Sequence, residues 1–201
     1  MDGTLIDTEA AAAKSIRDSF SEWNIQIVDE DAHFITGRTW EMAFRYLFAK
    51  YSIPLPHDEA AKSLLDRYRY QMQNELIEVP GAVKAVKTLA ETFPLALVSG
   101  SHRADIEWAL KKLGIRDHFQ AVLGAEDYPR SKPAPDGYKK ALHLLNAKPE
   151  STLVFEDSEA GIKSGLDAGL HVCVITSTNH FGVDTSLGHF FIPDLTGVDP
   201  A

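Results

Sequence analysis

The chain has 201 residues, of which 44% are hydrophobic and 24% charged, enough for one good-sized domain or a domain with a smaller insert. Its formal net charge of -9 disfavours non-specific binding to nucleic acid or an anionic membrane, because phosphate groups would be repelled. The single cysteine, Cys173, cannot form an internal disulfide, which fits a reducing compartment. No apolar run approaches the roughly 20 residues that span a bilayer. We therefore expect a cytoplasmic protein with no nucleic-acid or membrane partner.

The chain opens with a loop, Met1 to Thr8, of the kind that normally follows a buried strand. Asp2 stands next to Gly3, which can adopt backbone angles that other residues avoid. Thr4 adds a hydroxyl that can form a hydrogen bond with an oxygen atom or with a metal-bound water. We expect the later polar residues of the chain to converge on this loop.

An all-helical unit is predicted over residues 9–79. At its start, apolar residues recur at spacings of four, four and three, which places them on one helix face: Ala12, Ile16, Phe20 and Trp23. Thr8 is the expected N-cap of this helix, which would end near residue 23. Two further helices are expected over about 40–50 and 58–78, and no strand-like run precedes residue 90.

From Pro80 onward, short apolar runs alternate with amphipathic helices. The apolar runs are expected strands: 95–98, 121–123, 153–155, 172–175 and 190–192. The helices are expected at about 80–91, 103–113 and 138–145, with one more that ends near 168. This alternation indicates βαβ units, and hence an α/β fold built on a Rossmann-like parallel sheet.

Polar residues follow these strands at the edge where the carboxyl ends of parallel strands meet. They are Asp2 in the opening loop, Ser99, Lys132 in a proline-stiffened loop, and Glu156 with Asp157. Each has an ordinary explanation when taken alone: a turn, a helix cap, a solvated lysine, or acids at a helix N-terminus. Together, a hydroxyl, an ammonium group and two acidic clusters predict a site for phosphate and a divalent cation.

The expected cation is Mg²⁺. It is typically held by one or two carboxylates together with phosphate oxygens, and Asp157 with Glu156 beside it can supply the carboxylates. Lys132 would offset the negative charge that phosphate and carboxylates bring together.

The expected chemistry is phosphoryl transfer. The Ser99 hydroxyl and the amides of Gly100 and Ser101, at a helix N-terminus, can donate hydrogen bonds to phosphoryl oxygens. Asp2 is expected to protonate a leaving group and later to deprotonate water.

Four motifs stand in order along the chain: Asp2-Gly3-Thr4-Leu5-x-Asp7-Thr8, Val98-Ser99-Gly100-Ser101, Lys132-Pro133-x-Pro135-Asp136 and Phe155-Glu156-Asp157-Ser158-x-x-Gly161. In order and spacing they resemble the motifs of the haloacid dehalogenase-like hydrolases, of the helical-cap phosphatase and phosphomutase type. The resemblance covers essentially the whole chain. It implies a core of residues 1–8 and 80–201, and a cap of residues 9–79 that chooses the substrate. It also implies a Mg²⁺-dependent phosphomonoesterase that forms an aspartyl-phosphate, with a small phosphorylated, sugar-phosphate-like metabolite as substrate.

The first motif departs from the family's Asp-x-Asp-Gly-Thr. Asp2 matches the second aspartate, which implies the general acid/base and, through its backbone carbonyl, a metal ligand. The nucleophilic first aspartate would stand one residue before Met1, at the end of a central core strand that the given chain lacks. Either an N-terminal segment is missing or the protein is a degenerate member. We expect a missing apolar strand ending in Asp, because losing about five buried side chains at roughly 1.5–3 kcal/mol each rivals a domain's whole stability. The chain as given is expected to show no phosphatase turnover.

Substrate contacts are expected from residues beside these motifs. Arg38 follows Gly37 in a loop expected between helices, and it suits a phosphate or another anionic group. A surface role for Arg38 is an equal alternative. His102 and Arg103 could touch substrate, with simple solvent exposure as the other possibility. We expect a monomer or a weak homodimer.

Other activities stay open within this resemblance. The family's sugar phosphomutases use a cap histidine whose position here is matched by Ala12, which favours a phosphatase. Phosphonate-cleaving relatives use a cap lysine, for which Lys14 or Lys50 would have to serve. A dehalogenase would need no Mg²⁺, so the acidic pair Glu156-Asp157 argues against it. A catalytically dead module that binds phosphate or Mg²⁺ is the alternative from another class.

Overall fold

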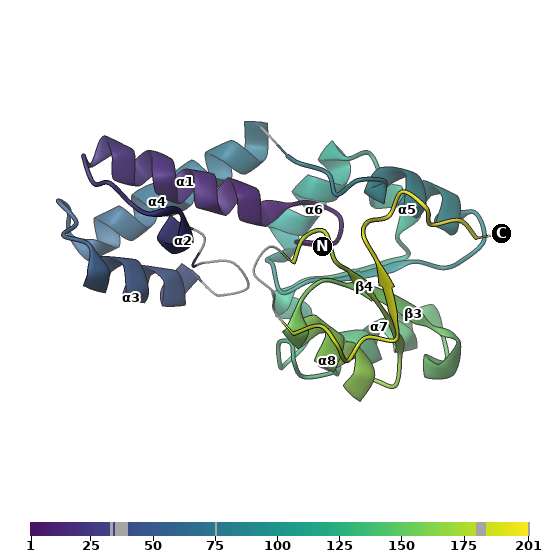
Figure 1. Ribbon diagram of the computed structural model, residues 1–201. Coiled ribbons are helices and arrows are strands. Elements are labelled where there is room, and N and C mark those ends of the chain that lie inside the picture. Colours follow the sequence, from purple (N-terminus) through teal and green to yellow (C-terminus); the bar gives the residue numbers. More distant parts are fainter. Residues whose placement is uncertain (33, 35–39, 75, 180–183, 201) are drawn as a thin grey trace. The chain divides into compact units, whose positions relative to one another are not determined.

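A computed structural model of the chain describes residues 1–32, 34, 40–74, 76–179 and 184–200 (Figure 1). The chain divides into two compact units. One comprises Met1–Ile6 with Glu78–Ala201, and the other comprises Asp7–Ile77. Among the described residues, no helix is both long and apolar enough to cross a membrane.

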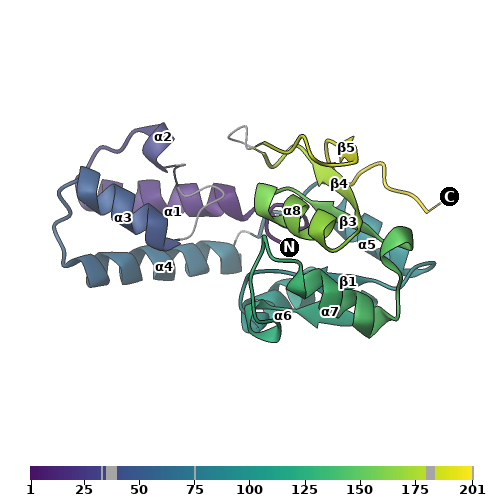
Figure 2. The same ribbon diagram turned by 90° about the horizontal axis from the view of Figure 1, so that it is seen from below.

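The unit of residues 7–77 is helical. Its helices are α1 (Thr8–Glu22), α2 (Asp29–Ala32), α3 (Trp40–Lys50) and α4 (His57–Asn74). α1 runs beside α4 (Figure 2), and the predicted apolar stripe of α1 contributes to one core with α3 and α4. The buried centre of this core contains Ile16, Phe20, Leu47 and Leu64. α4 ends about four residues before its predicted end, and the four-residue α2 is too short to leave a periodic signal in the sequence.

Asp7, rather than Thr8, caps the N-terminus of α1. The Asp7 carboxylate accepts hydrogen bonds from the backbone N–H groups of Glu9 and Ala10, each at 3.2 Å. Thr8 is the first residue of the helix and is buried. The prediction that Thr8 is the N-cap is therefore wrong, because an aspartate one position earlier satisfies two free N–H groups and adds a favourable charge at the positive end of the helix.

Asp31 of α2 forms the most connected polar cluster of the helical unit. Its side chain accepts hydrogen bonds from the Tyr46 hydroxyl at 2.6 Å, from the Lys50 ammonium at 2.8 Å and from the Tyr51 hydroxyl. Asp31 is 3% exposed. Burial works to raise its pKa, but the hydrogen bonds from Lys50 and the two tyrosines outweigh burial and lower it. This carboxylate is thus held as a stable anion that ties α2 to the end of α3.

The second unit is the α/β unit. Its strands are β1 (Ala96–Val98), β2 (Ala121–Leu123), β3 (Leu153–Glu156), β4 (His171–Ile175) and β5 (Phe190–Ile192). Its α-helices are α5 (Ala82–Ala90), α6 (Arg103–Lys112), α7 (Asp136–Leu145) and α8 (Glu159–Asp167). The described residues of this unit also form the short 3₁₀ helices η1 (Arg116–His118), η2 (Ala125–Asp127) and η3 (Pro149–Ser151). The expected alternation of strands and helices, and hence the α/β fold class, is confirmed.

The pairs among β1 to β5 are parallel, but these strands form two sheets rather than one. β1 pairs with β2, with Ala96 opposite Ala121. The other sheet has the order β3-β4-β5, with Leu153 opposite His171. Within the described part of the chain, no strand pairs β1 with β3. The alternating pattern predicts one parallel sheet, whereas the described strands form two.

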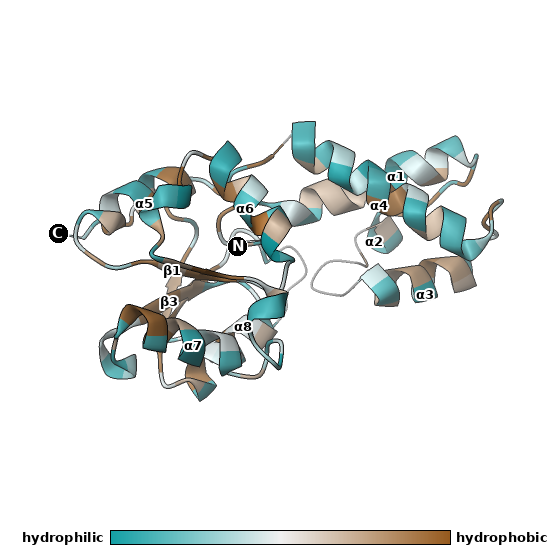
Figure 3. Cartoon of the chain, turned by 180° about the vertical axis from the view of Figure 1, so that it is seen from behind, coloured by the Kyte–Doolittle hydropathy of each residue, from teal (hydrophilic) through white to brown (hydrophobic). Residues whose placement is uncertain are grey.

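Helices cover both faces of the strands, as Figures 2 and 3 show. Leu97 packs in a core that includes α5 and α6, whereas its neighbour Val98 packs in a core that includes α7. This alternation follows from the two-residue period of a strand. The layers leave the carboxyl ends of β1 and β3 as the polar edge of the unit.

Candidate active site

The opening loop is fixed by backbone hydrogen bonds. The Met1 carbonyl accepts from the Leu5 N–H at 2.7 Å, and the Leu5 carbonyl accepts from the Val79 N–H at 3.0 Å. Leu5 is buried. The Thr178 hydroxyl donates to the Gly3 carbonyl at 2.7 Å. The loop is therefore anchored on the α/β unit, and it presents Asp2 and Thr4 to the residues that follow β1 and β3.

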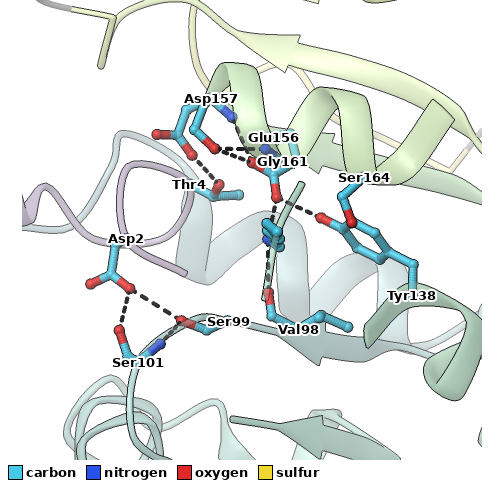
Figure 4. Close-up of polar contacts among 12 residues, drawn as sticks. Asp2, Thr4, Val98, Ser99, Ser101, Tyr138, Glu156, Asp157, Gly161 and Ser164 are labelled. Atoms are coloured by element: carbon cyan, nitrogen blue, oxygen red, sulfur yellow. Dashed lines mark hydrogen bonds and ion pairs between the residues drawn. The ribbon is translucent and has the colours of Figure 1, made fainter. Parts of the chain in front are cut away.

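Asp2 faces the motif after β1 (Figure 4). Its Oδ2 accepts hydrogen bonds from the Ser99 hydroxyl at 3.2 Å and from the Ser101 hydroxyl at 2.8 Å. The Ser99 Oγ also accepts from the Ser101 N–H at 3.1 Å, and Tyr128 donates its hydroxyl to the Ser99 carbonyl. Ser99 is 3% exposed. These contacts hold the turn after β1 against the opening loop.

Lys132 lies at the centre of a second group of contacts. Its ammonium forms an ion pair with Glu156 Oε1 and donates to the Val98 carbonyl at 3.2 Å. The Tyr138 hydroxyl donates to the same Glu156 oxygen. Burial acts to lower the pKa of Lys132, but the charge of Glu156 outweighs it and raises this pKa. Conversely, burial acts to raise the pKa of Glu156, and the Lys132 charge overrides it and lowers this pKa to about 2.

The second oxygen of Glu156 is also engaged. Oε2 accepts from the Asp157 N–H at 3.3 Å and from the Ser158 hydroxyl at 3.2 Å. Ser158 is the N-cap of α8 and accepts from the Gly161 N–H at 3.1 Å. A Cβ on Gly161 would stand 2.0 Å from Glu156 Oε2, so the glycine is what lets the carboxylate lie against the helix. With both oxygens bonded and 4% exposure, Glu156 is a positioning group for Lys132 and the start of α8.

The Asp157 carboxylate accepts fewer hydrogen bonds than the Glu156 carboxylate. Its Oδ1 accepts from the Thr4 hydroxyl at 2.9 Å (Figure 4), and among the described residues its Oδ2 accepts no hydrogen bond. A Cβ on Gly3, whose φ is +69°, would stand 1.9 Å from that Oδ2. Burial, followed by the nearby Glu156 charge, raises the pKa of Asp157 to about 7. The carboxylate is thus held in a place where its own negative charge is poorly compensated.

The structure brings together most of the residues that the sequence singles out. Asp2 joins Ser99 and Ser101, Lys132 joins Glu156, and Glu156 and Asp157 are adjacent at the end of β3. Gly100, between the two serines, is exposed. Arg38, a predicted substrate contact, lies outside the described residues. These groupings leave the catalytic and binding roles of the residues as predictions.

The acidic residues at the edge of the unit face different partners. In the described residues, no three His, Cys, Asp or Glu side chains are grouped closely enough to hold an ion together. Glu156 turns toward Lys132 and Tyr138, whereas Asp2 turns toward the two serines. Because Asp2 is expected to bind the metal through its backbone carbonyl, ligation of Mg²⁺ by Asp2, Glu156 and Asp157 stays a prediction.

Sequence reasoning misses three hydroxyls that complete the site: Tyr128, Tyr138 and Thr178. Tyr138 is a buried residue of α7, where it reads as part of an apolar helix face. Its contacts with Glu156 and with the Lys132 ammonium over its ring give it a polar role. Spacing in the sequence carries no signal for such a pairing, because the partner stands 18 residues away on another element.

His102 and Arg103 follow the serine turn but face other partners. His102 Nδ1 lies 3.0 Å from Glu126 Oε1, and the His102 side chain is 75% exposed. The Arg103 guanidinium forms an ion pair with Asp127 at 3.1 Å. Both side chains are thus tied to η2, and the alternative of solvent exposure describes His102 well.

Parallel strands flanked by helices, with acids, hydroxyls and a lysine gathered at their carboxyl ends, are the features of a Rossmann-like α/β core with a polar edge. Residues 1–175 match the family model described as haloacid dehalogenase-like hydrolase, and the chain belongs to this family. It is 29% identical to the fructose-1-phosphate phosphatase YqaB of Escherichia coli over 85% of this chain and 90% of that protein.

Solved structures show the same fold. A putative β-phosphoglucomutase from Thermotoga maritima has a TM-score of 0.86 at 21% identity, covering 98% of this chain and 93% of the other. The putative hydrolase YfnB from Bacillus subtilis, solved with magnesium bound, has a TM-score of 0.77 at 20% identity, covering 97% and 92%. These solved structures show the fold, and the family match with its named phosphatase relative shows that the chain is a haloacid dehalogenase-like enzyme.

Proposed function

We propose that this protein is a Mg²⁺-dependent phosphomonoesterase of the cytoplasm that acts on a small, sugar-phosphate-like metabolite through an aspartyl-phosphate. The nucleophilic carboxylate would belong to the residue immediately before Met1. One observation carries the proposal: the opening loop meets both the serine turn after β1 and the acid that follows β3, through Asp2 with Ser101 and Thr4 with Asp157.

The donor set fits a magnesium ion at Asp157. Mg²⁺ prefers carboxylate and carbonyl oxygens and keeps several waters. Asp157 offers an oxygen without a hydrogen-bond donor among the described residues, in surroundings that raise its pKa to about 7, and a nearby cation would reverse that effect. The Asp157 carboxylate and the Asp2 backbone carbonyl are the proposed ligands. Glu156 is left out of the set, because both its oxygens are bonded. When bound, the ion would neutralise charge on the phosphoryl oxygens.

Asp2 is the proposed general acid/base. Its Oδ2 is occupied by two serine hydroxyls, while Oδ1 accepts no hydrogen bond from the described residues. In the first step the nucleophilic carboxylate bonds to phosphorus, the ester P–O bond breaks, and Asp2 gives its proton to the leaving alcohol. In the second step Asp2 takes a proton from water, whose oxygen bonds to phosphorus and releases the carboxylate and inorganic phosphate. The sum is ester plus water giving alcohol plus phosphate.

The remaining groups bind and orient the phosphoryl group. Ser99, with the amides of Gly100 and Ser101, would donate to its oxygens at the start of the turn before α6. Lys132, fixed between Glu156 and the Val98 carbonyl, would balance its charge. Substrate choice is assigned to the helical unit, with Arg38 as the proposed anion contact.

Hydrolysis of p-nitrophenyl phosphate with and without Mg²⁺ tests this function. The given chain should show no turnover. A chain extended before Met1 by an apolar strand ending in Asp should hydrolyse the ester only with Mg²⁺. The matched control carries the same extension ending in Asn and should be inactive. Inactivity of both the given chain and the Asp-extended one would reject the enzyme and leave a non-catalytic phosphate- or Mg²⁺-binding module.

Two residues of the helical unit bear on the rival activities. Lys50 is bound to Asp31, whose hydrogen bond raises the pKa of Lys50, so its amine is unsuited to the neutral form that a Schiff base requires. Ala12 is buried in the helical core and has no side chain for proton transfer. A phosphomutase would be recognised by formation of an isomeric sugar phosphate in place of inorganic phosphate.

A further inference from the structure

Tyr128 is a buried aromatic residue that directly follows η2, and its hydroxyl reaches the turn after β1. The hydroxyl donates a hydrogen bond to the Ser99 carbonyl at 2.8 Å. Tyr128 is 7% exposed. Burial raises the pKa of Tyr128, so the hydroxyl keeps its proton and acts as a donor at neutral pH. The proposed reaction makes no use of this residue, yet its hydrogen bond ends on the peptide group that joins Ser99 to Gly100.

The ring of Tyr128 is held from two sides. It belongs to a buried cluster that includes Val98 and Leu123, the last residues of β1 and β2. On the side of α7, a Cβ on Gly137 would stand 3.1 Å from Tyr128 Cε1 and 2.7 Å from Val98 Cγ1. The absence of a side chain at Gly137 therefore makes room for the ring. The hydroxyl thus reaches Ser99 from a closely packed ring that has little freedom to move.

The main-chain groups of this turn are mostly bonded within the α/β unit. The Ser99 N–H donates to the Leu123 carbonyl at 3.0 Å, and the Ser101 carbonyl accepts from the Ala125 N–H at 3.0 Å. The Ser101 N–H donates to Ser99 Oγ. The Gly100 N–H, by contrast, donates to no acceptor within the described part of the chain. Gly100 is exposed, and a Cβ built on it would have no atom beyond its chain neighbours within 4 Å. This amide is therefore the donor that the turn leaves to solvent or to a ligand.

The carbonyl that Tyr128 holds and the amide of Gly100 belong to the same peptide group. Because a peptide group is planar and almost always trans, its C=O and N–H point in opposite directions. A hydroxyl that fixes the Ser99 carbonyl therefore also fixes the direction of the Gly100 N–H, away from the ring of Tyr128. Ser99 is 3% exposed, so water cannot easily replace the lost donor. Without the hydroxyl, the peptide group would turn toward another partner.

We propose that Tyr128 is a positioning residue that aims the Gly100 N–H at a phosphoryl oxygen by holding the Ser99 carbonyl on the opposite side of the same peptide group. Donors that are oriented before the ligand arrives stabilise its charge without a cost of reorganisation. The phosphoryl ligand rests on the proposed function, whereas the orientation of the peptide group does not. Tyr128 itself touches no substrate in this role.

The orientation is tested with Tyr128→Phe, which removes the hydroxyl and keeps the ring. Tyr46→Phe is the matched control, because the Tyr46 hydroxyl donates to Asp31 at 2.6 Å in the helical unit and its loss should lower stability without changing the turn. The order and direction of the Gly100 N–H are measured by ¹⁵N relaxation and residual dipolar couplings. In Tyr128→Phe the order parameter should fall from about 0.85 toward about 0.6, the values of rigid and flexible backbone. The control should keep the wild-type order parameter and coupling.

Titration with inorganic phosphate in the presence of Mg²⁺ measures the consequence for binding. The wild-type chain and Tyr46→Phe should have the same phosphate dissociation constant. In Tyr128→Phe this constant should be about three- to tenfold higher, the range that one hydrogen bond covers. Urea midpoints of all three proteins are measured as well. Both variants should have a lower midpoint, so only the change in phosphate affinity separates a positioning role from a structural one.

The outcomes separate this role from the proposed function. An unchanged order parameter and coupling of the Gly100 N–H in Tyr128→Phe would overturn the role, whatever the phosphate affinity. Loss of order with an unchanged phosphate dissociation constant would also overturn it, because Tyr128 would then be a structural residue. If the wild-type chain binds no phosphate and Tyr128→Phe still loses order, the orientation of the peptide group is supported. The phosphoryl ligand, and with it the proposed function, is then rejected.

Discussion

The helical unit buries the Asp31 carboxylate and the α/β unit half-buries the Asp157 carboxylate, and the two groups have opposite surroundings. Asp31 of the helical unit accepts hydrogen bonds from one ammonium and two hydroxyls, and its pKa is lowered. Asp157 of the α/β unit accepts from the hydroxyl of Thr4, and its pKa is raised to about 7. The first acid is saturated by the protein itself. The second is left with unused bonding capacity, as expected of a group that binds something else.

Glu156 shows that this contrast is local rather than a property of each unit. It stands next to Asp157 in the chain, yet both its oxygens are bonded and Lys132 compensates its charge. In the α/β unit one acid is thus paired with a lysine, whereas its neighbour keeps an oxygen that accepts no hydrogen bond from the described residues. Four changes, taken from the largest expected effect to the smallest, test this distinction.

Replacement of Lys132, whose ammonium pairs with Glu156, should have the largest effect. Lys132→Met leaves Glu156 as a buried anion without its partner, and breaking a buried pair in this way destabilises a fold by about 3–5 kcal/mol. Urea unfolding monitored by circular dichroism measures the loss. Lys163→Met, on an exposed position of α8, is the matched control and should change stability by less than about 0.5 kcal/mol. Equal effects of the two variants would show that Glu156 does not depend on Lys132.

Removal of the charge on Asp31 should come next. Asp31→Asn replaces a carboxylate that holds three donors, so we expect a loss of about 1–3 kcal/mol at pH 7. The folded-state pKa lies below the unfolded value of 3.8, so this stabilisation is complete above that value and is lost as the pH falls through the folded pKa. The difference between the urea midpoints of the two proteins should therefore be constant above pH 3.8 and begin to narrow below it.

The control for Asp31 is Asp29→Asn. Asp29 forms an exposed pair with Arg17 at 3.4 Å, and such pairs contribute little. A pH-independent gap between wild type and Asp31→Asn would contradict the assignment of the anion as the stabilising form.

Replacement of Asp157 should change how much Mg²⁺ stabilises the protein. With Mg²⁺ at ten times its dissociation constant, the wild-type chain should gain about 1.4 kcal/mol of stability by mass action. Asp157→Asn should lose this gain, as followed by thermal unfolding against Mg²⁺ concentration. Asp105→Asn, an exposed residue of α6, is the control that should keep it. An unchanged Mg²⁺ response in Asp157→Asn would remove Asp157 from the ligand set.

Thr4→Val should give the smallest change. It removes the hydroxyl that reaches Asp157 without altering the shape of the side chain much, which corresponds to about 0.5–1.5 kcal/mol. The same substitution in the Asp157→Asn background forms a double-mutant cycle that isolates the contact. Additive effects in this cycle would show that Thr4 acts on stability through other neighbours.

The sequence predicts the elements better than their ends or their partners. The alternation after Pro80 gives every strand and every long helix of the α/β unit, since period and burial are encoded locally. The cap of α1 moves from Thr8 to Asp7, because either residue satisfies the pattern and only geometry decides. The division of the sheet between β1 and β3 depends on pairing across distant segments, to which no local pattern responds.

In the site, too, the positions of the residues are predictable from local sequence, but their contacts are not. Asp2, Ser99, Lys132, Glu156 and Asp157 are recognisable because they stand where strands end. Their different tasks are set by contacts with residues such as Tyr138 and Thr4 that belong to other elements. The two adjacent acids after β3 look equivalent in the sequence, and only the structure separates the saturated one from the other.

The approach of Gly3 and Gly161 to the two acids has a consequence for how the protein can vary. A Cβ added at either position would overlap a carboxylate oxygen. It would lie 1.9 Å from Asp157 Oδ2 at Gly3 and 2.0 Å from Glu156 Oε2 at Gly161. In a library that samples every amino acid at both positions, selection for Mg²⁺-dependent stabilisation should favour glycine, and more strongly at Gly3, whose φ of +69° also disfavours other residues. The positions of the two acids thus depend on the absence of a side chain at Gly3 and at Gly161. An alanine scan of the acids themselves would not reveal this dependence.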